Sequence, residues 1–227
     1  MKSKKLLIFC LVAVFALSLM GFGFAKWSDT VTIGATVATG NVDISIEPGK
    51  VLDEGVDPQK WPEANNCEKK DVAQTELTAV GCDKNELDLK ITNAYPWYLT
   101  GYTFRINGEG TVPVKIEDIK TKIQSDRLGL KDFIVVKNWT IHVVNPASNG
   151  LPAEDRTIES NKYTNSWDGL VKALKGIQIH QGGYVEVTVN FYIRETIKCG
   201  WQTKIAPQKA NLSAKIEINA AQWNEVN

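Results

Sequence analysis

The feature that most restricts the fold of this chain is a strict alternation of apolar and polar side chains near its C-terminus. Apolar residues fill every second position of one run: Val185, Val187, Val189, Phe191 and Ile193. A period of two places these side chains on one face of a strand, whereas a helix would distribute them around its circumference. Shorter runs with this period occur at residues 31–37, 42–46, 87–91, 102–106, 112–116 and 212–220, and residues 133–144 are rich in Ile, Val and Trp. The sequence therefore predicts a sheet protein whose strands each have a buried face.

Polar segments that contain proline or glycine separate these strands and predict surface loops. We expect long loops at residues 47–70 and 145–166, and another loop around Pro207. We expect irregular structure at residues 117–131, where the apolar side chains have only weak helical spacing.

One segment has the clear periodicity of a helix. Its apolar residues are spaced i, i+3, i+4 and i+7, and Ser166 precedes them as a cap: Trp167, Leu170, Val171 and Leu174. The expected fold is thus all-β, a jelly-roll-like two-sheet sandwich with one short helix and long loops. Residues 26–227 suffice for a single sandwich domain, and a chain of this length needs no metal or cofactor to form its core.

The first 25 residues have the three regions of a secretory signal peptide. Lysines at positions 2, 4 and 5 precede an apolar run, and Gly23 and Ala25 supply small residues at positions −3 and −1 of a cleavage site. We expect a signal peptidase to cut between Ala25 and Lys26 and the mature protein to be secreted. The alternative is an uncleaved anchor, because the apolar run approaches the roughly 20 residues that span a bilayer.

The charge balance argues against nucleic acid as a partner. The whole chain has 26 basic and 26 acidic side chains, and the first 25 residues contain three lysines and no acid. Cleavage would leave a net charge of about −3 on the mature protein. Nucleic-acid binding requires a clustered basic face, and the sequence shows no such cluster.

Three cysteines would survive cleavage. Cys67 and Cys82 flank a short polar segment and are the expected disulfide pair, which would contribute about 3 kcal/mol to stability. Cys199 is then left free or available for an intermolecular bond. The sequence alone does not decide among the three possible pairings.

The sequence offers little for catalysis, and we expect no enzyme activity. Its two histidines, His142 and His180, lie outside any His-Glu-x-x-His motif, and no Gly-x-Ser-x-Gly elbow is present. We expect edge or loop histidines that form local hydrogen bonds. Tryptophans can also build a sugar-binding platform, but apolar neighbours favour core and strand-end packing for five of them: Trp97, Trp139, Trp167, Trp201 and Trp223.

Several short segments resemble one family. The segments are residues 26–30 (Lys-Trp-Ser-Asp-Thr), 39–44 (Thr-Gly-Asn-Val-Asp-Ile), 93–96 (Asn-Ala-Tyr-Pro), 110–115 (Gly-Thr-Val-Pro-Val-Lys) and 222–225 (Gln-Trp-Asn-Glu). They are similar to the TasA/camelysin family of bacterial secreted surface and matrix proteins, whose signal peptides are removed by a SipW-type peptidase. The resemblance covers about half of the chain. It implies a cell-surface or biofilm-matrix protein that assembles into fibres, with itself or other matrix proteins as partners.

Fibre assembly would use strand addition, in which an extended segment of one subunit completes a sheet of the next. The expected donor is residues 27–37, which begin at Trp27 and place four apolar residues on one face: Val31, Ile33, Ala35 and Val37. The same strand could instead pair within its own subunit. Two other functions stay open at this point, a secreted camelysin-like metallopeptidase and a wall protein that binds carbohydrate.

Overall fold

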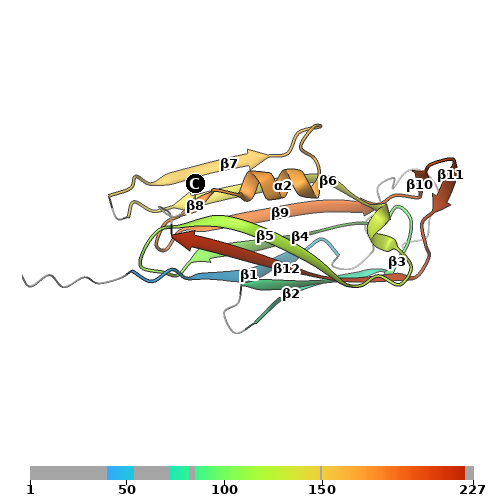
Figure 1. Ribbon diagram of the computed structural model, residues 1–227, viewed down its shortest axis with the longest axis horizontal. Helices are drawn as coiled ribbons and strands as arrows, with labels where there is room; N and C mark the ends of the chain where they lie inside the picture. Colours follow the sequence, from blue (N-terminus) through green and yellow to red (C-terminus); the bar gives the residue numbers. More distant parts are fainter. Residues whose placement is uncertain (1–39, 54–71, 82–84, 149, 223–227) are drawn as a thin grey trace, which may run out of the picture. The chain divides into compact units, whose positions relative to one another are not determined.

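The computed structural model describes residues 40–53, 72–81, 85–148 and 150–222. They belong to one compact unit, Gly40–Asn227, whose described part forms two five-stranded antiparallel sheets and a separate hairpin (Figure 1). The strands of the first sheet, in spatial order, are β1 (Ile44–Val51), β4 (Leu99–Gly108), β9 (Tyr184–Ile193), β6 (Ile134–Asn145) and β7 (Glu154–Glu159). The second sheet has the order β2 (Gln74–Val80), β3 (Glu86–Ala94), β12 (Ala210–Gln222), β5 (Val114–Ser125) and β8 (Gln178–Ile179).

Several predicted features lie outside the described residues. They are the signal peptide of residues 1–25, the cleavage site at Ala25 and Lys26, the strand at residues 27–37, the cysteines Cys67 and Cys82, and Trp223. These features stay predictions.

The strand pairing is that of a jelly roll. In this fold, the first strand of the roll pairs with the last, the second with the last but one, and so on to the middle of the chain. The nested pairs here are β3 with β12, β4 with β9, β5 with β8, and β6 with β7. The first two strands add one edge to each sheet, β1 beside β4 and β2 beside β3. The predicted all-β sandwich is confirmed, together with its jelly-roll order.

The core lies between the two sheets and follows the alternation that predicted it. All five apolar residues of the run in β9 are buried, and the polar residues between them face outward. Rings from neighbouring strands meet inside, where Tyr102 contacts both Phe104 and Phe191 at centroid distances of 6.2 and 6.0 Å. Burial raises the pKa of the Tyr102 hydroxyl well above its ordinary value.

The predicted helix is also confirmed. It is α2 (Trp167–Leu174), which buries Leu170 and Leu174. The Ser166 hydroxyl caps the helix by accepting a hydrogen bond from the Gly169 backbone N–H at 3.0 Å.

Three predicted loops contain strands. Residues 117–131 are not irregular, because β5 continues to Ser125 and a 3-10 turn, η1 (Leu130–Phe133), follows. The expected loop at residues 145–166 contains β7, and the region before Pro207 contains a hairpin of β10 (Thr196–Cys199) and β11 (Gln202–Ile205). These strands face solvent on much of their surface. Backbone hydrogen bonds to the neighbouring strand are enough to hold them, so their sequences need no alternation of apolar side chains.

The expected loop at residues 47–70 begins later than predicted, because β1 extends through Pro48 to Val51. Pro48 is tolerated there because β1 is an edge strand, and its register against β4 shifts between Pro48 and Val51. The strand β2 was not anticipated.

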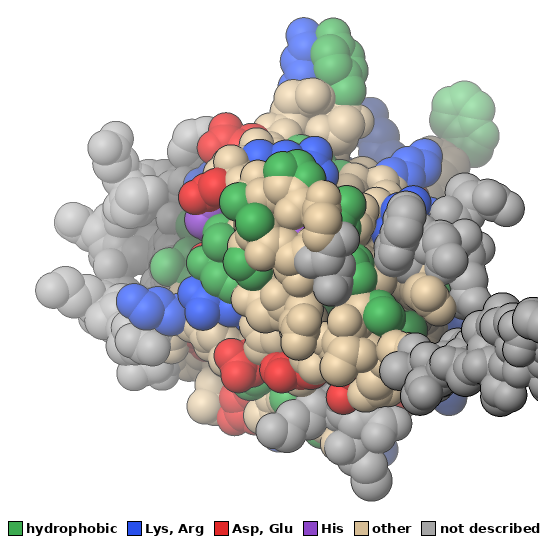
Figure 2. Space-filling view, turned by 90° about the vertical axis from the view of Figure 1, so that its left-hand side faces the viewer, with side chains coloured by type: hydrophobic (Ala, Val, Ile, Leu, Met, Phe, Trp, Pro, Cys, Tyr) green, Lys and Arg blue, Asp and Glu red, His purple; other side chains and the backbone are tan. Residues whose placement is uncertain are grey.

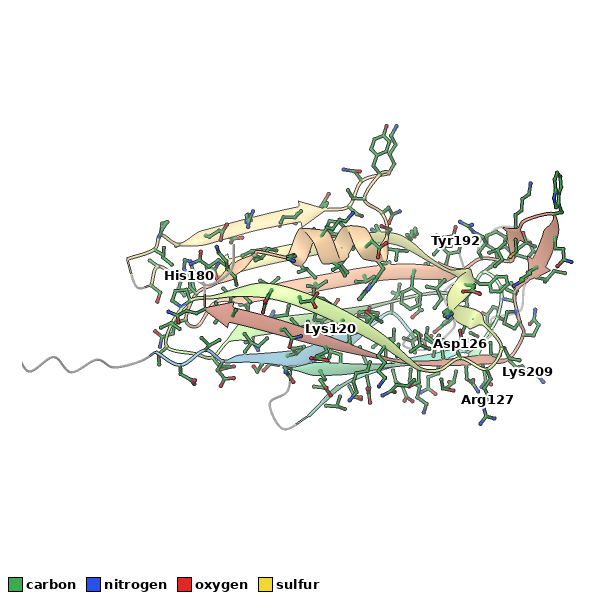
Figure 3. All side chains as sticks on the ribbon, viewed as in Figure 1. Lys120, Asp126, Arg127, His180, Tyr192 and Lys209 are labelled. Carbon is green, nitrogen blue, oxygen red and sulfur yellow. The ribbon has the colours of Figure 1, made fainter. Side chains whose placement is uncertain are left out.

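The two ends of the sandwich are built from different parts of the chain. At the first, the Asp43 end, the Asp43 carbonyl accepts hydrogen bonds from Glu109 and Gly110, and the Asn41 N–H donates to the Thr111 hydroxyl. The strand β12 finishes at this end, with Gln222 opposite Val114. The other, the hairpin end, carries η1 and the β10–β11 hairpin (Figure 1). In Figure 3, His180 lies toward the first end and Arg127 and Lys209 toward the second.

Candidate functional site

One side of the sandwich is incompletely closed. The short strand β8 pairs only with Val114 and Lys115 of β5, and the turn before β8 bonds the backbone of Ile116. On the facing sheet, β7 pairs with β6 only from Thr140 onward. The second half of β5, residues 117–125, therefore has β12 as its one paired neighbour among the described strands.

A groove of about 550 Å³ opens at this unfinished side, and we call it the seam groove. Its floor consists of core residues from both sheets: Leu89, Tyr102, Val189, Phe191, Leu212, Ala214 and Ile216. Its walls are Thr121 and Ile123 of β5, residues 134–136 of β6, and residues 165–167 at the start of α2. Lys131, Asp132 and Arg194 complete the lining, which places the groove toward the hairpin end.

The side chains of β5 show that the core is open here. Ile119, Thr121 and Ile123 alternate along the strand, and Ile119 is buried as expected for a core-facing position. Ile123 lies on the same face and is nevertheless 39% exposed. An apolar residue that points between the sheets and still meets solvent marks a place where a further strand would fit.

The other wall of the groove is held firmly by Trp139. Its ring is only 2% exposed, and its indole N–H donates to the Thr164 carbonyl at 2.8 Å. This bond fixes residues 160–166, the segment that leads into α2. In the same segment the Asn165 amide donates to the Lys137 carbonyl, while the buried Asn165 Oδ1 has no hydrogen-bond partner among the described residues. The Asn165 side chain thus ties the segment before α2 to β6.

Lysines mark the free edge of β5. Lys120 and Lys122 lie on the exposed half of the strand, next to Thr121 and Ile123. Charged side chains on an edge strand oppose random pairing with other sheets, because such pairing would bury them. The edge is therefore protected against unspecific pairing while the apolar floor beside it stays open.

The histidines are not brought together. His142 lies on the outer face of the first sheet, with its Nε2 2.9 Å from Asp155 Oδ1, whereas His180 follows β8 and bonds the Pro146 carbonyl through Nδ1 at 2.8 Å. The predicted local hydrogen bonds are confirmed, although β6, which carries His142, is an inner strand and not an edge. Among the described residues no group of three His, Cys, Asp or Glu side chains could hold a metal ion.

Two further sequence predictions concern the hairpin. Cys199 is exposed in β10 as a free cysteine, while the predicted pairing of Cys67 with Cys82 stays a prediction. Trp201 lies in the turn between β10 and β11 and is fully exposed, so the prediction of core or strand-end packing is wrong for this residue. Apolar neighbours in the sequence misled the prediction, because the hairpin points away from the core.

The opposite side of the sandwich is closed by a buried polar cluster. The Tyr98 hydroxyl lies 2.9 Å from the Thr75 hydroxyl, and the Thr75 N–H donates to Asp53 Oδ2 at 2.5 Å. The cluster thus ties Asp53, two residues after β1, to Thr75 of β2 and to Tyr98, the residue before β4. Burial raises the pKa of the Tyr98 hydroxyl well above its ordinary value, so the group stays protonated and able to donate.

Replacing Tyr98 with phenylalanine should therefore lower the free energy of unfolding by about 1 to 3 kcal/mol, since the buried Thr75 hydroxyl loses its partner. Urea unfolding monitored by circular dichroism measures the change. Tyr163→Phe is the matched control, because Tyr163 is 83% exposed and should change stability by less than about 0.5 kcal/mol. Equal stability of the two variants would contradict a structural role for the cluster.

Sequence reasoning missed the seam groove. The available signal was the period of two across residues 119–123, where apolar Ile119 and Ile123 alternate with Lys120 and Lys122. None of the described helices is long and apolar enough to cross a membrane. Comparison with protein-family models gives no match, and comparison with curated proteins also gives none.

Proposed function

We propose that the mature chain is a secreted surface or matrix structural protein whose subunits join head to tail by strand donation. The observation that carries the proposal is the seam groove, where the core-facing Ile123 is exposed in the half of β5 that pairs with β12 alone among the described strands. Such a groove binds an extended segment in two ways: the strand edge supplies backbone hydrogen bonds, and the apolar floor receives alternate side chains.

The donor segment suggested by the sequence matches this surface. Val31, Ile33, Ala35 and Val37 would face the apolar floor, and the intervening residues would face outward. A slip by one residue would expose every one of these apolar side chains, so the register of the added strand would be well defined.

The position of the groove favours donation between subunits. Gly40 and Asn41 lie at the Asp43 end, whereas the groove opens toward the hairpin end. Residues 27–39 can span at most about 45 Å, which suffices to reach into a second subunit. A segment that turned back into its own groove would have to pass the part of β5 that β8 already occupies.

Donation from one end into a groove near the other is a heterologous contact. Contacts of this kind do not close on themselves unless the rotation between subunits permits a ring, so they produce open filaments. The proposed function therefore predicts fibres, in line with the resemblance of the N-terminal segment to fibre-forming matrix proteins.

Replacing Ile33 with lysine tests the donated strand. A lysine at this position would be carried into the apolar floor without a partner, and we expect the mature protein to remain folded but to form no fibres. Negative-stain microscopy of the concentrated protein, beside thermal unfolding of the same sample, measures both properties.

Thr32→Lys is the matched control, since residue 32 would lie on the outward face of the proposed strand, where its lysine would reach solvent. It should assemble like the wild type. Normal fibres from Ile33→Lys would refute donation, and so would a wild-type protein that forms none. A large loss of thermal stability in Ile33→Lys would place the strand within its own subunit.

A further inference from the structure

The β10–β11 hairpin exposes an apolar tip. Gly200 and Trp201 form its two-residue turn, with Gly200 at a φ of +62°, a backbone conformation that glycine adopts without strain. Trp201 is fully exposed and Ile205 is 73% exposed. Trp201 is therefore the one large apolar side chain at the tip, since Ile205 lies opposite Thr196 at the base of the hairpin. An exposed tryptophan on a projecting element is typical of a binding surface.

The hairpin is also basic and lies beside the seam groove. Lys198 and Lys204 are exposed on its two strands, and neither strand contains an acidic residue. Arg194, which lines the groove, lies two residues before β10. A donated strand whose C-terminal end left the groove on this side would bring the rest of its subunit close to the hairpin.

The surface that such a neighbour would bring is the Asp43 end, where the donor segment joins the sandwich. Asp43 and Glu109 are exposed there, and Figure 2, which faces this end, shows acidic side chains gathered in the lower part of the view. The same end has a shallow hollow of about 250 Å³, whose lining is both polar and apolar: it includes Asp43, Asn85 and Asn219 beside Val42, Ile44, Ile218 and Ala220.

We propose that the hairpin is a clasp that binds the Asp43 end of the next copy of this chain. Trp201 would occupy the hollow, and Lys198 and Lys204 would face Asp43 and Glu109. The inference rests on the proposed head-to-tail assembly and adds a second contact to each junction. It matches a projecting side chain with a hollow, and positive with negative charge.

A second copy explains more of the structure than a lipid surface does. A tryptophan between lysines is also suited to an anionic bilayer. A bilayer, however, would leave the acidic Asp43 end and its hollow without a role. It would also not account for the position of the hairpin beside the groove that receives the neighbouring chain.

The first test is the concentration at which the mature protein begins to sediment as fibres. Trp201→Ser should raise this concentration at least about tenfold, equivalent to about 1.4 kcal/mol per junction. Lys90→Ser is the control, because Lys90 is exposed on β3 and lines neither the groove nor the hollow, and it should leave the concentration unchanged.

Charge reversal identifies the partner surface. The double variant Lys198→Glu with Lys204→Glu should also assemble poorly, and adding Asp43→Lys with Glu109→Lys should restore assembly. Failure of the second pair to restore assembly would remove the Asp43 end as the binding surface.

A photo-crosslinker attached to the Cys199 thiol gives a direct readout. With isotope-labelled and unlabelled copies mixed, crosslinked peptides should join the hairpin of one copy to residues around Asp43 of another. Crosslinks only within one copy, or only between two hairpins, would overturn the clasp.

The outcomes separate the clasp from strand donation. Unchanged assembly of Trp201→Ser, with assembly abolished in Ile33→Lys, would reject the clasp and leave donation standing. The reverse pattern would reject donation and support the clasp. Binding of the wild type to vesicles containing anionic lipid that is lost in Trp201→Ser, with unchanged assembly, would assign the hairpin to a membrane surface and overturn the proposal.

Discussion

Trp139→Ala is expected to lower the free energy of unfolding by about 3 to 5 kcal/mol, the usual cost of removing a buried aromatic ring. Trp139 is 2% exposed, and its indole N–H holds the Thr164 carbonyl. The Trp139 backbone N–H donates to the Ser160 hydroxyl at 2.9 Å, and this bond should be kept in the variant. For a domain of this size, we expect the melting temperature to fall by about 6 to 20 °C.

Two variants complete this experiment, which requires only thermal and urea unfolding. Trp139→Phe should lose less stability than Trp139→Ala, because it keeps most of the apolar volume and loses the hydrogen bond. Trp201→Ala should change stability by less than about 0.5 kcal/mol, since that ring is fully exposed. If Trp139→Ala and Trp201→Ala lowered the free energy of unfolding equally, Trp139 would not be the more buried of the two tryptophans.

The second large effect is expected from supplying the donor strand as a peptide. A chain that begins at Gly40 retains all the described strands, and its groove would be free to bind a synthetic peptide of residues 26–39. At a peptide concentration of 100 times its Kd, binding should stabilise the folded chain by about 2.7 kcal/mol. Calorimetry gives the Kd, and thermal unfolding with increasing peptide concentration gives the stabilisation.

One change on each side of the groove serves as a control. The same peptide with Ile33→Lys should not bind, and the wild-type peptide should not bind a chain with Ile123→Lys in the groove wall. Equal binding of the wild-type peptide to the Ile123→Lys chain would show that the peptide binds elsewhere. Such a result would leave the fold unaffected and remove the groove as the acceptor.

The sequence predicted the parts of the fold in which one face of an element is buried. The alternation in β9 and the helical spacing around Leu170 both reflect contact with the core, and the structure has both elements. Prediction failed for β7 and the hairpin, because strands that face solvent need no alternation of apolar residues. It also failed for residues 117–125. These residues line or border the groove and are largely exposed, so their sequence lacks the regular alternation of a buried strand.

The candidate site could not be predicted for a related reason. Its floor is made of ordinary core residues such as Phe191 and Leu212, which are as buried as the rest of the core. Their sequence therefore carries no sign that they line a groove. The exposed tip at Trp201 was missed because tryptophan is usually buried, and only the direction of the hairpin shows that this one is not.

Both ends of the described chain leave the sandwich on the same side, which affects how the protein can be labelled. Asn41 lies beside Thr111, and Gln222 lies opposite Val114, so the two positions are held by the same connection between β4 and β5. A fluorescent domain fused after residue 227 would be tethered near the surface from which the donor segment departs, and its bulk would obstruct a neighbouring subunit. A small dye on a cysteine replacing Lys172, on the exposed side of α2, would avoid that obstruction.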